Sequence, residues 1–340
     1  MDTFFIWLKF LLCVLIILVA ARKVARYGDI IADKTGLGGL WVGLLLLAAV
    51  TSLPELFTGI SSVALVKKPD LAIGTVFGSN AINLTILALM DVAHHNRPLL
   101  TAASLRHLLP AGLSMVLVAV GAVCVLISTR TNNDLGIGWM IGIYTPLLIL
   151  LYLLFLRMIF KYEQRQSFGA PEETGVSKYE SVSLRRAYLG FAIAALFVIG
   201  AGTWLAYVGR DIAESTGWDE SFVGSLFLAF TTSLPEISVS FAALQLGAID
   251  MCVANIIGSN MFNMTIIAVD DVFYRQGPVL AAVSESHGYT GLIVLAMTCI
   301  VMFGIVSRTR RKTRFGFTWY VPLLVGLFLL GAYLSFTQSH

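Results

Sequence analysis

Ten long apolar stretches run through this chain and leave room for little other structure. Hydrophobic residues make up 57% of the 340 residues and charged residues only 13%, whereas soluble domains are about 45–50% apolar and about 25% charged. A helix needs about 20 mostly apolar residues to cross a bilayer. We therefore predict an all-α polytopic membrane protein with ten transmembrane helices, the first retained as a span, at residues 3–21, 37–65, 71–92, 108–128, 137–160, 187–208, 221–246, 250–273, 287–306 and 317–336.

Basic residues predict the orientation of these spans. If the chain crosses the membrane at each stretch, 17 basic residues fall in one set of loops and 5 in the other. Cytoplasmic loops carry the excess of Lys and Arg. We therefore expect an integral protein of the cell (inner) membrane with both termini on the non-cytoplasmic side. Residues 161–186, which are polar and contain no apolar run, are expected to form a flexible cytoplasmic linker.

Two motifs occur twice inside the apolar stretches. Thr-Ser-Leu-Pro-Glu at 51–55 returns at 232–236, and Gly-Ser-Asn at 78–80 returns at 258–260. The offset is 181 residues for the first motif and 180 for the second. The chain therefore divides into a first half at 1–160, with its repeat at about 41–92, and a second half at 187–340, with its repeat at about 222–272. Five spans per half is an odd number, so the halves are inverted, and inverted repeats place transport sites at their interface near the midplane.

The chemistry of the repeated motifs indicates a cation site. Pro54 and Pro235 each lie inside a span, where a proline frees a carbonyl group one turn earlier. Glu55 and Glu236 follow directly, and an ionisable residue at such depth marks an ion pathway. Carboxylate and carbonyl oxygens are the ligands that hard cations such as Ca²⁺ and Na⁺ prefer. A single serine or threonine in a span is more often a packing residue, but the symmetric duplication of the whole set favours a binding site.

These motifs resemble those of the Ca²⁺/cation antiporter superfamily, and in particular the sodium/calcium exchanger family of prokaryotic type. The resemblance implies antiport of Ca²⁺ and Na⁺ by alternating access, with the first two spans of the halves sliding against a rigid bundle of the rest. It implies no enzyme activity and no cofactor, because Ca²⁺ and Na⁺ are the transported ions. The oxygen ligands that it implies are Glu55, Glu236, Thr51 and Thr232 for Ca²⁺, with Ser52, Ser233, Ser79, Ser259, Asn83, Asn263 and the carbonyl groups of Ala48 and Ala229 completing the ion sites.

The sequence departs from the family pattern at one central position. Several prokaryotic relatives carry Asp where Asn263 stands, so the central site has two carboxylates here. H⁺-coupled cation antiport, with the glutamates as proton carriers, therefore remains an alternative to Na⁺ coupling. An alternative of another class is a non-transporting membrane sensor or structural protein with a vestigial site. An intramembrane enzyme is disfavoured because the spans offer no nucleophile–base pair, and a net charge of +3 gives no support for a nucleic-acid partner.

Three further polar groups lie outside the repeated motifs. Asp91, Asp270 and Asp271 stand near the ends of the third and eighth spans, where we expect them to cap helices or to pair at an interface; Asp91 is also placed to guide ions or protons. His94 and His95 are expected to be solvated loop residues. The basic run at 308–314 is expected to determine topology, with binding of anionic lipid as the alternative.

The orientation of the spans is testable by cysteine labelling. A single cysteine introduced between residues 162 and 186 should resist a membrane-impermeant maleimide in intact cells and react after permeabilisation, because the distribution of basic residues places this segment in the cytoplasm. A cysteine introduced at residue 2 or 339 should show the opposite behaviour. Efficient labelling of the linker in intact cells would overturn the predicted orientation.

Overall fold

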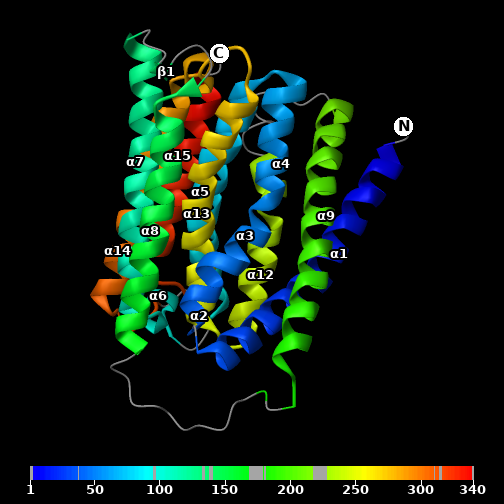
Figure 1. Ribbon diagram of the computed structural model, residues 1–340, viewed down its shortest axis with the longest axis vertical. Helices are drawn as coiled ribbons and strands as arrows, with labels where there is room; N and C mark the ends of the chain where they lie inside the picture. Colours follow the sequence, from blue (N-terminus) through cyan, green and yellow to red (C-terminus); the bar gives the residue numbers. More distant parts are fainter. Residues whose placement is uncertain are drawn as a thin grey trace.

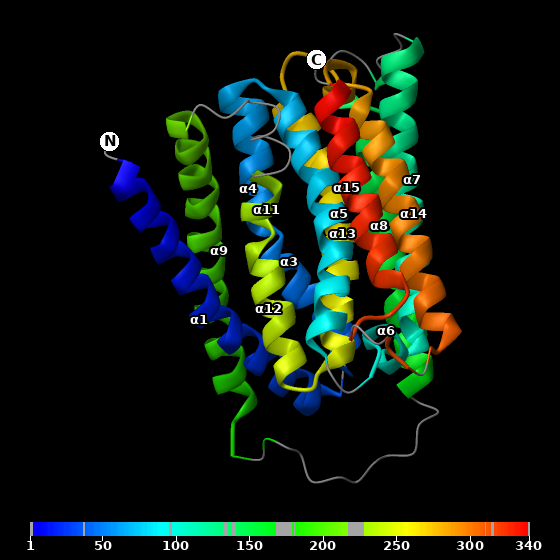
Figure 2. The same cartoon turned by 180° about the vertical axis from the view of Figure 1, so that it is seen from behind.

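The computed structural model consists almost entirely of long helices that stand side by side (Figures 1 and 2). It describes residues 3–36, 38–94, 97–131, 135–137, 141–167, 179, 181–216, 228–309, 311–313 and 316–338. Residues 168–178 and 180 of the expected linker and the start of the seventh span lie outside these residues. The elements are, in chain order, α1 (Thr3–Thr35), α2 (Gly38–Trp41), η1 (Val42–Leu47), α3 (Ala48–Thr51), α4 (Leu53–Ser61), η2 (Ser62–Val66), α5 (Pro69–Ala93), α6 (Leu99–Ala102), η3 (Leu105–His107), α7 (Leu108–Thr131), β1 (Gly136–Ile137), β2 (Ile141–Gly142), α8 (Tyr144–Ser167), α9 (Leu184–Thr216), α11 (Leu228–Thr232), α12 (Leu234–Gln245), α13 (Ile249–Phe273), η5 (Val279–Ala282), α14 (Ser286–Ser307) and α15 (Tyr320–Gln338).

The predicted ten-span architecture is confirmed, with differences at the boundaries. Eight segments of the described chain are long and apolar enough to cross a membrane. The interrupted pair α11–α12 and the C-terminal helix α15 supply the other two crossings. Helix α1 continues to Thr35, beyond the predicted end at residue 21, because Val24, Ile30 and Ile31 carry a buried apolar face past the basic residues. The predicted start of the fifth span at residue 137 is wrong, since β1 and β2 form a short antiparallel pair there and α8 begins at Tyr144.

The two ends of the molecule are distinct. Both chain termini lie at one end, which we call the terminal end (Figure 1). Helix α8 ends and α9 begins at the opposite end, which we call the linker end. Helix α4 lies toward the terminal end, whereas α12 runs toward the linker end, so equivalent helices of the two halves point in opposite directions (Figure 2).

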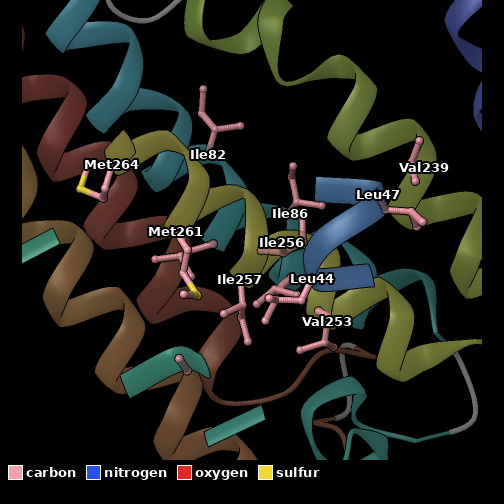
Figure 3. Close-up of a cluster of buried hydrophobic side chains, with 14 of the residues drawn as sticks. Leu44, Leu47, Ile82, Ile86, Val239, Val253, Ile256, Ile257, Met261 and Met264 are labelled. Carbon is pink, nitrogen blue, oxygen red and sulfur yellow. The ribbon is translucent and has the colours of Figure 1, made fainter. Parts of the chain in front are cut away.

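The interior is built where α5 and α13 cross between the two interrupted spans. Figure 3 shows Leu44 and Leu47 of η1 packed among residues of α5, α12 and α13. Gly258 of α13 allows a close approach here, because a Cβ atom on it would lie 2.4 Å from the Leu44 carbonyl oxygen and 2.8 Å from Ala48 Cβ. Small residues of this kind let helices pack backbone to backbone in membranes. The repeated Gly-Ser-Asn motif is thereby held against the span that carries the first Thr-Ser-Leu-Pro-Glu motif.

Helices α1 and α9 form a separate layer along one flank of the bundle. They pack along each other over much of their length (Figures 1 and 2). Two small apolar clusters on this layer, one around Cys13, Ile17 and Leu205 and one around Ile6 and Val208, are separate from the main core. The layer nevertheless reaches the repeated motifs through Gly202 of α9, on which a Cβ atom would lie 2.6 Å from Pro54 Cγ and 3.3 Å from Pro235 Cγ.

Asp91 and Asp271 each hold one end of the bundle together. Asp91 Oδ1 accepts from the Tyr320 hydroxyl at 2.6 Å and from the Leu99 backbone N–H at 2.8 Å, and Oδ2 accepts from the Thr318 backbone and hydroxyl. Asp271 repeats this arrangement: Oδ1 accepts from the Tyr144 hydroxyl at 2.6 Å and from the Val279 backbone N–H at 2.7 Å. Its Oδ2 accepts from Gly142 and Thr145. The expectation that these two aspartates pair at interfaces is confirmed, and both carboxylate oxygens of Asp91 are occupied by these hydrogen bonds.

Two histidine–aspartate pairs provide a second symmetric tie. His107 Nε2 lies 2.8 Å from Asp250 Oδ1 at the start of α13, and His287 Nε2 lies 3.0 Å from Asp70 Oδ1 at the start of α5. Each aspartate also accepts a backbone N–H from the segment that precedes the histidine. These residues recur at an offset of 180, so the signal was present in the sequence. In the basic segment, Arg308 binds the carbonyl oxygens of Thr101 and Ala103, a structural role alongside the expected topological one.

The aspartate ties generate a prediction about stability. Asp271→Ala leaves four buried donors without an acceptor, and each costs roughly 1–3 kcal/mol. We expect destabilisation of at least about 3 kcal/mol, seen as a fall of roughly 4 °C or more in the apparent melting temperature in detergent. Asp91→Ala should lower the melting temperature to a similar extent. Glu285→Ala, which removes an exposed partner of Arg130, should melt close to the wild type. Equal melting temperatures of Asp271→Ala and Glu285→Ala would contradict the structural role of Asp271.

Candidate cation site

Each glutamate of the repeated motif stands just after a break in its helix. Ser52 has φ −90° and ψ 1°, and Ser233 has φ −81° and ψ 0°, so both residues leave helical geometry at equivalent positions. Pro54 and Pro235 occupy the start of the helix that follows, where their missing N–H is not needed. Glu55 and Glu236 therefore lie in the first turn of α4 and α12. A helix N-terminus favours negative charge, and its first N–H groups lack partners within the helix.

Hydroxyl groups of both repeats contact the two carboxylates, and one of these contacts joins the repeats directly. The Ser52 hydroxyl donates to Glu236 Oε1 at 3.0 Å, across 184 residues of sequence, and Ser259 donates to the same oxygen at 3.4 Å. The Ser79 hydroxyl lies 3.5 Å from Glu55 Oε1 and donates to it. Two hydroxyl pairs complete the crossing, Thr51 with Ser259 at 3.3 Å and Thr232 with Ser79 at 3.5 Å. The two broken spans and the two Gly-Ser-Asn motifs therefore form one site.

Asparagines connect the centres of α5 and α13 beside the glutamates. The Asn83 amide donates to Asn260 Oδ1 at 3.0 Å, and the Asn263 amide donates to Asn80 Oδ1 at the same distance. Asn80 and Asn260 belong to the repeated Gly-Ser-Asn motifs but were not predicted as site residues. The duplication of Asn80 and Asn260 was the signal in the sequence that could have identified them. It did not show their hydrogen-bond partners, which lie some 180 residues away. They orient Asn83 and Asn263 so that the side-chain oxygens of these two residues stay free of the crossing bonds.

The site is rich in acceptors that lack donors. Glu55 Oε2, Glu236 Oε2, Asn83 Oδ1 and Asn263 Oδ1 are buried and have no hydrogen-bond partner in the part of the chain that the structure describes. Within that part, no Lys, Arg or His forms an ion pair with either glutamate. Buried charges in proteins are paired or coordinate ions. An arrangement of inward acceptors without basic groups is therefore suited to a desolvated cation.

The remaining predicted residues lie in the same region with different contacts. The carbonyl oxygens of Ala48 and Ala229 each accept a backbone N–H from the serine at the break and a hydroxyl from the threonine before it. Ser233 Oγ has no partner among the described residues, although its equivalent Ser52 binds Glu236. The site is therefore pseudo-symmetric, with one serine engaged and one free. No cluster of three His, Cys, Asp or Glu residues with metal-ligand geometry occurs in the described ranges, so His94 belongs to no such centre there; His95 lies outside them.

An inverted repeat of ten spans with a buried acceptor site at its centre defines a class of secondary transporter. Comparison with known proteins supplies the family. The model of the sodium/calcium exchanger protein family matches residues 5–161 and 186–338, which is nearly the whole chain. The chain therefore belongs to the sodium/calcium exchanger family and is a cation antiporter, not an enzyme.

Individual relatives agree with this assignment. The chain is 29% identical to the inner membrane protein YrbG of Escherichia coli K12 over 74% of this chain and 75% of that protein. It is 22% identical to the putative antiporter CaxA of Alkalimonas amylolytica over 90% and 92% of the two chains. Its fold matches structures of the sodium-calcium exchanger NCX_Mj with a TM-score of 0.72 at 20% identity, over 97% of this chain and 99% of that one.

The crossed asparagines generate a prediction about position 263. Asn263→Leu removes the donor to Asn80 Oδ1 and leaves a buried acceptor unpaired, at a cost of roughly 1–3 kcal/mol. Asn263→Asp should destabilise the protein less. Asn80 Nδ2 has no partner among the described residues, so rotation of the Asn80 amide lets this nitrogen donate to the new carboxylate. Apparent melting temperatures in detergent should follow the order wild type, Asp, Leu. A Leu variant as stable as the wild type would contradict the role of the crossed pair.

Proposed function

We propose that this protein exchanges Ca²⁺ for Na⁺ across a membrane, with Glu55 and Glu236 as the central ligands of both ions. The observation that carries this proposal is the meeting of two carboxylates from opposite repeats, with four unpartnered acceptor oxygens and no basic group bound to them within the described chain. Two ionised glutamates balance one Ca²⁺. Ca²⁺ accepts irregular sets of six to eight oxygens at about 2.3–2.6 Å, and the carboxylates, amide oxygens and motif carbonyl groups offer such a set.

Relatives support the choice of ions. One relative of 29% identity over 40% of this chain is named sodium/calcium exchanger MaX1, from Methanosarcina acetivorans. Another, of 27% identity over 40% of this chain, is the human sodium/potassium/calcium exchanger 2. We extend the exchange named in both to this chain. The name of the Escherichia coli relative similarly supports an inner-membrane location.

Burial of the site supports alternating access. Glu55 is 1% exposed, and Glu236, Asn83 and Asn263 are 0% exposed, so ions reach these side chains only after helices separate. The α1–α9 layer is the element that we infer to move. It has its own small apolar clusters, and Gly202 places it directly on Pro54 and Pro235. Sliding of this layer along the bundle exposes the glutamates to one end of the molecule and then to the other.

The proposal is tested by transport in proteoliposomes. An outward Na⁺ gradient should drive uptake of radioactive Ca²⁺ by the wild type, and a pH gradient of equal size should not. Glu55→Gln and Glu236→Gln should each reduce uptake by about 100-fold or more, because a unit charge beside a divalent ion contributes several kcal/mol even at an effective dielectric near 20. Glu285→Gln, which removes a carboxylate outside the site, serves as the matched control and should transport normally.

Two results would contradict the proposal in different ways. Uptake driven by the pH gradient alone would replace Na⁺ with H⁺ as the coupling ion. Normal uptake by a folded Glu55→Gln or Glu236→Gln variant would remove the glutamates from the site. Folding of each variant is checked by its elution as a single species and by its melting temperature.

A further inference from the structure

Asp270 is a buried carboxylate that the cation site described above does not use. It is 0% exposed, and neither of its oxygens has a hydrogen-bond partner within the described residues. Its neighbour Asp271, equally buried, accepts four hydrogen bonds, and Asp91 accepts four as well. The expectation that Asp270 caps a helix or pairs at an interface is therefore wrong. This fold saturates its structural aspartates with donors and leaves Asp270 with none.

The position of Asp270 connects it to the central site. It lies seven residues after Asn263 on α13, which is two helical turns along the same face, roughly 10 Å away. Its carboxylate faces Gly59 of α4, where a Cβ atom would lie 2.7 Å from both Oδ1 and Oδ2. Gly59 is one turn after Glu55 on the same helix, roughly 6 Å along its axis. The carboxylate thus lies between α4 and α13, displaced from the glutamates toward the terminal end.

The other repeat shows that packing does not require a charge here. At the offset of 180, the residue equivalent to Asp270 is Met90, which is 0% exposed. The equivalent of Gly59 at the offset of 181 is Ser240, whose hydroxyl is bound by Asn255. The linker half of the pathway therefore carries an apolar side chain where the terminal half carries a carboxylate. The asymmetry confines this extra negative charge to one side of the central site.

We propose that Asp270 binds an alkali-metal cation, Na⁺ in this transporter, on the route between the glutamates and the terminal end. The inference rests on the proposed Na⁺/Ca²⁺ exchange and adds a residue to it. Burial without donors disfavours the ionised form of a carboxyl group, so Asp270 ionises only together with a positive partner, and a hard cation satisfies such an acceptor-only group. One carboxylate matches one monovalent charge. The two glutamates already neutralise a divalent ion. Asp270 therefore adds a negative charge that balances a further Na⁺, and Ca²⁺ binding does not need it.

The test measures Na⁺ and Ca²⁺ binding separately on the purified full-length protein, by scintillation proximity with ²²Na⁺ and ⁴⁵Ca²⁺. Asp270→Asn should weaken Na⁺ binding about tenfold or more, since a unit charge close to the bound ion is lost. Its Ca²⁺ affinity in the absence of Na⁺ should equal that of the wild type, whereas a larger Na⁺ concentration should be needed to displace Ca²⁺. Glu55→Gln should weaken the binding of both ions.

Three further variants keep the test decisive. Asp270→Met introduces the residue that stands at the equivalent position of the other repeat, Met90, and should reproduce the Asp270→Asn result. Gly59→Ala keeps every charge but displaces the carboxylate, and should also weaken Na⁺ binding. Met90→Leu is the matched control at the symmetric position and should bind both ions normally.

The outcomes separate this inference from the proposed function. Wild-type Na⁺ binding in both Asp270→Asn and Asp270→Met would overturn it. A change only in the sensitivity of Ca²⁺ binding to acid, with Na⁺ binding intact, would overturn it in favour of a proton carrier. Loss of Ca²⁺ binding in these variants without Na⁺ present would overturn it as well. If the wild type binds Na⁺ through Asp270 but does not bind Ca²⁺, the exchange function fails and the Asp270 site stands.

Discussion

Two buried carboxylates that pair with no basic residue of the described chain are the constraint on which the rest of this structure depends. Removing a carboxylate from water is costly, and the cost is tolerated only where dipoles or ions compensate it. Here the helix breaks at Ser52 and Ser233 place Glu55 and Glu236 at helix N-termini, and the hydroxyl groups of Ser79 and Ser52 donate to them. These dipoles orient the carboxylates and leave one oxygen of each without a donor. The site is therefore ordered, while its negative charge stays available to a cation.

The buried carboxylates of this protein differ in the number of donors around them. Asp91 and Asp271 each accept four hydrogen bonds and connect helix ends to neighbouring loops. Both glutamates receive donors on one oxygen only, and Asp270 receives none among the described residues. A carboxylate saturated by hydrogen bonds has little left to offer an ion, whereas one with free oxygens is costly unless an ion arrives. Among these five acids, the oxygens without donors belong to the three that we propose to bind ions.

Pseudo-symmetry explains how one site can serve two sides of a membrane. The hydroxyl crossings, the asparagine crossings, the aspartate ties and the histidine–aspartate pairs each occur twice, once in each direction. In the alternating access that we propose, two conformations related by exchange of the halves would be close in energy. The departures from symmetry, Ser233 against Ser52 and Asp270 against Met90, are where the two directions differ chemically. These departures make the two sides of the site chemically different, which the repeat alone does not do.

The sequence by itself determined the ten spans and the inverted repeat, and it predicted the residues of the cation site. These follow from local properties: apolar stretches of spanning length, prolines that cannot continue a helix, and motifs that recur at a constant offset. The tertiary structure decided which groups meet. Nothing in the sequence pairs Ser52 with Glu236 or Asn263 with Asn80, because such contacts depend on how two distant spans cross. Asp270 and Asp271 show the difference most sharply. They are adjacent and chemically identical, yet a helix turns by about 100° per residue, so one faces four donors and the other faces the bare backbone of Gly59.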